Sequence, residues 1–496
     1  MLHPDLSKLL SQFVYHPNEP MIFSSGLFLF IFLGFITVYY LVHEDFRLKL
    51  TYVTLFSLFF YYKSSGIYFL LLILSTVVDY TLANKIYYAE KQNHKRWWLV
   101  LSLVLNLGLL TYFKYTNFFY SIYCDIANHH FDPFNIFIPV GVSFFTFQSL
   151  SYTIDIYRKE IKPIGNILDY AFFVSFFPQL VAGPIVRAKD FIPQIYKPTF
   201  VSKQDLGRAV FLIAAGLFKK AVISDYISAN FVDRIFENPT LYTGLENLMG
   251  VYGYALQIYC DFSGYSDMAI GIALLMGFHF NINFDSPYQS SSITEFWRRW
   301  HISLSTWLRD YLYISLGGNR KGRWRTYLNQ FLTMLLGGMW HMIGGLSYLA
   351  GFRFILWGAL HGVALGIDKY VKEFIKIPDT KLMKVLGIIF TFHFVCFCWI
   401  FFRAEDMVKA GQVLSQITMH FTPSVFFEFI SGYQKVLFVM TVGFILHFLP
   451  RSMELKAQEW VTEFPLAGKI AILAAVVVLV IQVKSSEIQP FIYFQF

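Results

Sequence analysis

Long apolar runs alternate with short polar segments along most of the chain. A helix that crosses a membrane needs roughly 20 predominantly apolar residues, and most of these runs approach that length. The pattern predicts spans at 21–42, 48–62, 65–83, 97–113, 136–154, 206–224, 245–260, 262–278, 327–345, 346–367, 384–402, 434–449 and 468–483. We therefore expect an all-α polytopic membrane protein that forms a single domain over residues 1–496.

Two further apolar segments are too short or too interrupted to cross a membrane simply. The segment 169–184 contains Pro178 and ends in Gly183 and Pro184, whereas 295–311 is amphipathic. Its apolar residues form one helical stripe, at 297, 300, 304, 307, 308 and 311. Irregular backbone survives at membrane depth only inside protein or beside a wet cavity, so we look for a site at these two segments.

Composition supports the membrane assignment. Hydrophobic residues make up 56% of the chain and charged residues only 15%, against about 25% charged in soluble domains. The net charge of +8 does not indicate a nucleic-acid partner, because the basic residues lie in short loops between predicted spans. The densest basic loop, 298–325, is expected to face the cytoplasm, and membrane lipids surround the spans. The four cysteines lack metal-ligand spacing, so no metal site is expected.

A histidine in an apolar helix is the first candidate for chemistry. His341 follows Trp340 and the pair Gly337 and Gly338, and small residues allow a neighbouring backbone or ligand to approach. An imidazole, with a pKa of about 6.5, can take a proton from a hydroxyl group near neutral pH. A lone buried histidine can equally be a structural hydrogen-bonding residue, and spacing alone does not decide between these roles.

The amphipathic segment 295–311 is the second candidate. Arg298 and Arg309 lie opposite its apolar stripe, and His301 lies at the border. A helix of this kind can lie in the membrane interface, where its arginines bind either lipid phosphates or the phosphates of a cytosolic donor such as coenzyme A.

Polar residues in two other apolar stretches complete the candidates. Asp261 and Asp267 need partners in an apolar neighbourhood, and the basic stretch 298–309 is the expected source. Structural ion pairing is the favoured role for both. Gln179 lies in the proline-broken segment 169–184, where its amide can either turn toward a ligand or belong to a simple re-entrant turn.

At these same residues the chain resembles the membrane-bound O-acyltransferase family, in the branch of the alginate O-acetylation protein AlgI. The motifs that carry the resemblance lie at 144–148, 176–184, 261–268, 296–301, 307–313, 317–320, 334–341 and 356–361. They fall in order within a core region, 136–370. The tract 342–345 departs from the family pattern, which puts the identity of the acceptor in doubt. The aromatic chain end, 490–496, matches more loosely.

The resemblance implies a fold and a set of roles. The fold is a ring of about 11–13 transmembrane helices, with re-entrant and interfacial helices, around a central tunnel. His341 matches the family's catalytic histidine and His301 matches a second one upstream. Arg298, Arg299 and Arg309 are expected to hold the phosphates of the donor. Two further residues are expected to contact it, Gln179 and Trp340.

The resulting hypothesis is an O-acetyltransferase in a bacterial cytoplasmic (inner) membrane. It would pass an acetyl group from a cytosolic thioester, acetyl-CoA, toward the hydroxyls of a cell-surface polysaccharide such as alginate. An extracytoplasmic acetyltransferase would be its partner, and no tightly bound cofactor is expected. The alternatives are D-alanyl transfer or peptidoglycan acylation by the same chemistry. A transporter or flippase is a further alternative, because broken spans and buried charges fit it as well.

Overall fold

The computed structural model describes residues 11–17, 19–342 and 347–483, and the regular structure in these ranges is helical. The first part contains α2 (Gly26–Val42), α3 (Phe46–Ser65), α4 (Phe69–Tyr88), α5 (Gln92–Ile126), α6 (Val142–Tyr157), α7 (Ile167–Ser175), α8 (Phe177–Leu180) and α9 (Ala188–Ile195). The middle contains α10 (Lys203–Leu217), α11 (Asp225–Ile227), α12 (Asp233–Glu237), α13 (Gly244–Leu275), α14 (Ile293–Arg299), α15 (Ile302–Trp307), α16 (Arg323–His341) and α17 (Tyr348–Phe374). The last part contains α18 (Lys381–Arg403), α19 (Met407–Met419), α20 (Phe426–Gly432), α21 (Gln434–Phe448), α22 (Arg451–Glu463) and α23 (Leu466–Val483).

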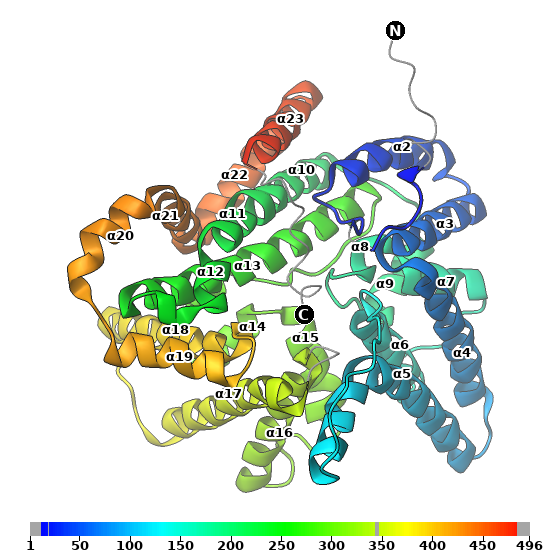
Figure 1. The fold of residues 1–496 in the computed structure, drawn as a ribbon. Helices are drawn as coiled ribbons and strands as arrows, with labels where there is room; N and C mark the ends of the chain where they lie inside the picture. Colours follow the sequence, from blue (N-terminus) through cyan, green and yellow to red (C-terminus); the bar gives the residue numbers. More distant parts are fainter. Residues whose placement is uncertain (1–10, 18, 343–346, 484–496) are drawn as a thin grey trace.

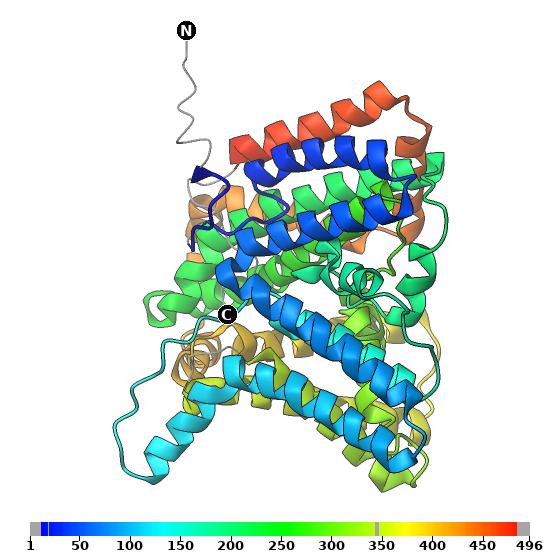
Figure 2. The same cartoon turned by 90° about the vertical axis from the view of Figure 1, so that its right-hand side faces the viewer.

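The longer helices surround the short helices α14 and α15 (Figure 1). Figure 2 shows the N-terminal helices lying side by side across one flank of this ring. The all-α polytopic fold agrees with the sequence prediction, and the central tunnel stays a prediction. Residues 343–345, which belong to the tract that departs from the family pattern, lie within the segment 343–346 that is outside the described residues. The aromatic chain end, 490–496, also lies outside them.

By length and apolar composition, five described helical segments can cross a membrane: Phe46–Tyr88, Gln92–Ile126, Tyr348–Phe374, Lys381–Arg403 and Leu466–Val483. A sixth forms if Pro423–Gly432 and Gln434–Phe448, bent by 93°, count as one span. This number is smaller than the 11–13 expected. Several predicted spans fold as shorter helices, such as α2 with 17 residues and α6 with 16.

Helix α13 corrects one prediction. The two spans expected at 245–260 and 262–278 form a single helix of 32 residues, Gly244–Leu275. Thr243 and Glu246 form a capping box at its start. The carboxylate of Asp261, which separates the two apolar runs, pairs at 2.5 Å with the Lys220 ammonium. Because that charge is neutralised inside the protein, the helix continues past it.

The amphipathic segment corrects another prediction. Instead of one continuous helix over 295–311, the chain forms α14 and α15 with a break between them. Trp300 is extended, and His301 adopts the left-handed conformation with φ of 42°. Most of the predicted apolar stripe is nevertheless buried, because both short helices turn their apolar residues toward the same core.

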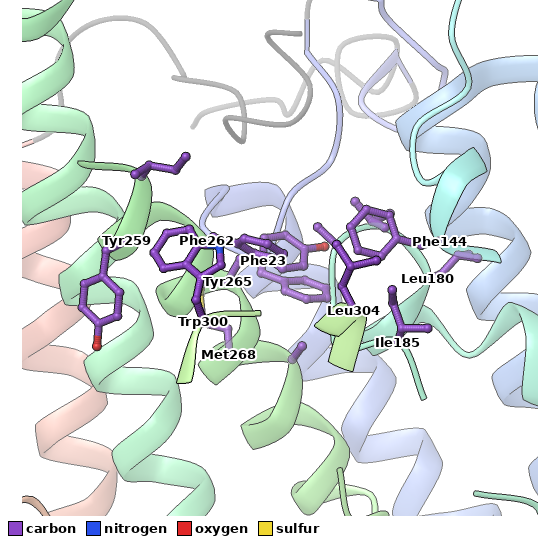
Figure 3. Packing of buried hydrophobic residues seen from close by; sticks show 14 of the residues in the cluster. Phe23, Phe144, Leu180, Ile185, Tyr259, Phe262, Tyr265, Met268, Trp300 and Leu304 are labelled. Carbon is purple, nitrogen blue, oxygen red and sulfur yellow. The ribbon is translucent and has the colours of Figure 1, made fainter. Parts of the chain in front are cut away.

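Aromatic side chains fill that core. Phe23, from the segment before α2, stacks on Tyr265 of α13 with ring centroids 4.6 Å apart. In Figure 3 these rings lie between Phe262 on one side and Phe144 of α6 on the other. Aromatic side chains from distant parts of the chain therefore pack the N-terminal segment against the centre of the helical ring.

Candidate active site

Helices α16 and α17 touch through their backbones next to the predicted catalytic histidine. A Cβ atom on Gly358 would lie 2.5 Å from the carbonyl oxygen of Met334, and one on Gly338 would collide with the carbonyl of Phe354. Only glycine allows this approach. His341 is the last residue of α16, so its position is set by this contact.

Three aromatic rings surround the imidazole of His341. The ring centroids of Trp340, Trp357 and Phe402 lie 4.8, 5.2 and 5.3 Å from it, all steeply inclined to its plane. Phe402 comes from α18 and Trp357 from α17. His341 is only 8% exposed, so its imidazole lies where bulk water is largely excluded.

Helix α5 caps the end of α16 that carries His341. The Lys114 ammonium donates to the carbonyl of Trp340 at 2.5 Å, and the Tyr115 hydroxyl donates to the carbonyl of Met339 at 2.9 Å. The last carbonyls of a helix lack intrahelical partners and carry partial negative charge, so a cation there is stabilising. Neither Lys114 nor Tyr115 was among the predicted site residues.

His301 is completely buried, and its ring is held by Asn283. The Oδ1 atom of Asn283 accepts from the backbone N–H and the hydroxyl of Ser303, and it lies 3.2 Å from Nδ1 of His301. Because Oδ1 is an acceptor in this cluster, Nδ1 of His301 carries the proton. Its Nε2 atom is then the basic nitrogen, and it has no hydrogen-bond partner among the described residues.

The ring of Phe144 connects the two histidines. It lies 6.5 Å from the ring of His301 and 5.9 Å from that of Trp340, the neighbour of His341. Both predicted catalytic residues therefore face one aromatic region between α6, α15 and α16. The break after Trp300 is what turns His301 toward this region.

We expect Asn283→Ala to lower kcat of the acyl transfer about 10- to 100-fold, because His301 would lose the contact that orients its ring. The KM for the donor should change little. Initial rates in membrane vesicles measure both. Ser266→Ala is the matched control, since Ser266 accepts a hydrogen bond from the amide nitrogen of Asn283, whereas His301 contacts the amide oxygen. Wild-type kcat in the Asn283 variant would contradict an orienting role.

The three predicted arginines differ in exposure and in their ion-pair partners. Arg298 is exposed, and Arg299 pairs with Glu295 at 2.8 Å. Arg309 pairs with Asp310 at 2.6 Å in the π-helical turn η6 (Leu308–Tyr313). Two of the three guanidiniums therefore already have a carboxylate partner.

Arg309 belongs to a cluster that the sequence did not reveal. Arg187 pairs with Asp310 at 2.5 Å, and Arg158 donates to the Asp310 carbonyl at 3.2 Å. Although partial burial acts in the opposite direction, hydrogen bonds from Arg309 and Arg187 lower the pKa of the Asp310 carboxyl. The guanidinium groups of Arg158 and Arg187 also lie over the ring of Tyr311.

Gln179 is buried in α8, at the broken segment. Its side-chain nitrogen donates to the carbonyl of Phe173 at 2.5 Å. Its Oε1 atom has no partner among the described residues. The interruption predicted at 169–184 is confirmed as the separate helices α7 and α8.

The expected partners of the two acidic residues in α13 are wrong. Asp261 and Asp267 pair with Lys220 and Lys219, at 2.5 and 2.7 Å, and these lysines belong to the π-helical turn η2 (Phe218–Ser224) after α10. The basic stretch 298–309 instead meets Glu295 and Asp310. The structural ion pairing itself is as expected.

Two other buried histidines are held by protein hydrogen bonds. Nδ1 of His361 accepts from the indole N–H of Trp297 at 3.2 Å, and Nε2 of His447 accepts from the backbone N–H of Tyr288 at 3.1 Å. Over residues 11–17, 19–342 and 347–483, no cluster of three or more histidine, cysteine or acidic residues is arranged to hold a metal ion.

The described chain is a helical membrane protein with two buried histidines at one aromatic region, and a buried neutral histidine can serve as the general base in acyl transfer. The family model of the membrane-bound O-acyltransferases matches residues 58–405. The chain belongs to this family, so it is a multi-pass membrane O-acyltransferase. The transporter alternative is thereby set aside.

Three known proteins are similar to the chain over more than half of its length. The chain is 44% identical over 403 residues to a probable alginate O-acetylase AlgI of Pseudomonas aeruginosa, covering 79% of this chain and 74% of the relative. It is 38% identical over 425 residues to a peptidoglycan O-acetyltransferase of Helicobacter pylori, with 79% of each chain covered. It is 30% identical over 296 residues to a teichoic acid D-alanyltransferase of Bacillus subtilis, covering 56% of this chain and 71% of the relative.

Proposed function

We propose that the chain transfers an acetyl group from a cytosolic thioester, acetyl-CoA, across the bacterial inner membrane toward hydroxyl groups of a cell-surface polysaccharide. The observation that carries the proposal is the placement of His301 and His341 at one buried aromatic region. The similarity to the O-acetylases of Pseudomonas and Helicobacter supports the acetyl group and a glycan acceptor.

His341 acts as the general base in this proposal. It takes the proton from an acceptor hydroxyl, whose oxygen forms a bond to the thioester carbonyl carbon. The tetrahedral intermediate then collapses, the carbon–sulfur bond breaks, and the departing thiolate receives the proton from His341. The basic Nε2 of His301 either relays a proton or orients the thioester.

The basic surface holds the donor in this proposal. Arg298, Arg299 and Arg309 bind its phosphates, and Gln179 and Trp340 contact its acyl end. Arginine forms bidentate, charge-assisted hydrogen bonds to phosphate, so each contact contributes to donor affinity more than to the chemical step.

We expect Arg309→Gln to raise the KM for acetyl-CoA roughly 10-fold with kcat nearly unchanged, because the contact binds ground state and transition state alike. Titrating radiolabelled acetyl-CoA against membrane vesicles measures both constants. Lys203→Gln is the control, since Lys203 is an exposed cation paired with Glu463. A fall in kcat at constant KM would contradict phosphate binding by Arg309.

The main test of the proposal asks whether the surface polymer is the acceptor of the acetyl group. Cells that lack the gene should export a surface polymer without O-acetyl groups, and the wild-type gene should restore them. An extracytoplasmic acetyltransferase would complete the transfer. Unchanged acetyl content would refute the polysaccharide assignment.

A second candidate keeps the chemistry and changes the substrates. The relatives include a peptidoglycan O-acetyltransferase and a D-alanyltransferase of teichoic acid. Comparing label transfer from acetyl-CoA with transfer from a D-alanyl carrier-protein thioester separates the donors. Analysing peptidoglycan and exopolysaccharide from the same cells separates the acceptors.

A further inference from the structure

The indole N–H of Trp357 has no hydrogen-bond partner among the described residues, although its side chain is 1% exposed. Leaving a buried donor unpaired costs about 1–3 kcal/mol, so such groups call for an explanation. Other buried or half-buried tryptophans do have acceptors: the indoles of Trp297, Trp307 and Trp399 donate to His361, Phe147 and Tyr288. The lack of a described acceptor therefore distinguishes Trp357 from these three tryptophans.

Trp357 lies against the predicted general base. Its ring centroid is 5.2 Å from that of His341, with 82° between the planes. Trp399 stacks on it at 5.9 Å, and Phe402 contacts it at 5.2 Å. The next residue, Gly358, makes the backbone contact with α16. The indole is thus fixed in place before any substrate arrives, as an electrostatic stabiliser must be.

Acyl transfer creates a need for such a donor. When the hydroxyl oxygen bonds to the thioester carbon, the π electrons of the carbonyl move onto its oxygen, which becomes an oxyanion. Hydrogen-bond donors at that oxygen stabilise the transition state strongly where water is excluded. A neutral N–H group meets this need and gives up no proton in the reaction.

We propose that Trp357 is a further catalytic residue, whose indole N–H donates a hydrogen bond to the thioester carbonyl oxygen as it becomes negatively charged. The inference rests on the proposed function and deepens it. When the carbon–sulfur bond breaks, the carbonyl re-forms, the thiolate takes the proton held by His341, and the indole keeps its own proton. The indole N–H of Trp340 also lacks a partner among the described residues, but Trp340 adjoins His341, so its substitution would disturb the proposed base directly.

The test removes the N–H group and keeps an aromatic ring. In membrane vesicles supplied with radiolabelled acetyl-CoA, Trp357→Phe should lower kcat on the order of 100-fold. The KM for acetyl-CoA should stay within about threefold, because the contact strengthens only in the transition state. The matched control is Trp399→Phe, which lies in the same stack and loses an N–H bonded to protein. It should lower kcat less than about threefold when rates are normalised to membrane protein level.

A second variant covers the case in which Trp357→Phe fails to accumulate. Trp357→His restores a ring N–H and should exceed the Phe variant about 10-fold in kcat, or retain measurable transfer where no Phe protein is present. The inference is overturned if Trp357→Phe keeps more than a third of the wild-type kcat, if both Phe variants lose activity equally, or if the His variant transfers no label. A wild-type protein that transfers no label from acetyl-CoA would instead overturn the proposed function, and the inference with it.

Discussion

His341→Ala should reduce acyl transfer on the order of 10³-fold, because it removes the general base on which the proposed reaction depends. The imidazole is enclosed by Trp340, Trp357 and Phe402, so the water that would replace it is poorly placed to act as the base. Acetyl content of the exported polymer, normalised to the amount of protein in the membrane, measures the loss.

The matched control for this prediction is His447→Gln. His447 is also buried, but its imidazole accepts from the backbone of Tyr288 and packs on Tyr259. Its replacement should cost stability and leave the rate per folded molecule close to wild type. Polymer acetylation that persists in His341→Ala, at normal protein level, would refute the catalytic assignment.

Lys220→Met should destabilise the protein by about 3–5 kcal/mol, the usual cost of removing one partner of a buried ion pair. The side chains of Lys220 and Asp261 are each only 2% exposed, so the carboxylate would lose its 2.5 Å partner where little water can reach it. Thermal unfolding in detergent, followed by intrinsic fluorescence, measures the change.

Two variants bracket this effect. Lys219→Met breaks a pair whose side chains are 27% and 20% exposed, so it should cost clearly less. The double substitution Lys220→Met with Asp261→Asn removes both charges and should recover part of the loss. Equal destabilisation by the two single lysine variants would show that burial of the Lys220 pair does not matter.

The predictable part of the fold was the part encoded in apolar runs. Runs longer than a helix turn but shorter than a span, such as 169–184, correctly indicated an interruption. The continuity of α13 was not predictable in this way, because it depends on Lys220 neutralising Asp261 from another helix. The π-helical turn η2 places the consecutive residues Lys219 and Lys220 against α13. The 3.6-residue period of a regular α-helix does not predict this arrangement.

The candidate site was predicted residue by residue but not as an arrangement. His341 and His301 were predicted as site residues from the sequence, whereas the contact of His301 with Asn283, 18 residues earlier, was not. Arg158 and Arg187 lie far from Arg309 in sequence and meet it only in the folded chain. The hydrogen bond from Lys114 to a carbonyl at the end of α16 joins residues 226 positions apart, so it could not be predicted from the sequence around Lys114.

The contact between Gly338 and Gly358 also bears on how the enzyme responds to its surroundings. Lipids of different chain length shift and tilt individual helices. Two helices joined backbone to backbone should tilt together, which would preserve the spacing between the His341 imidazole and the Trp357 indole. The turnover of this enzyme should accordingly depend little on bilayer thickness, and vesicles made from lipids of short or long acyl chains should support similar rates.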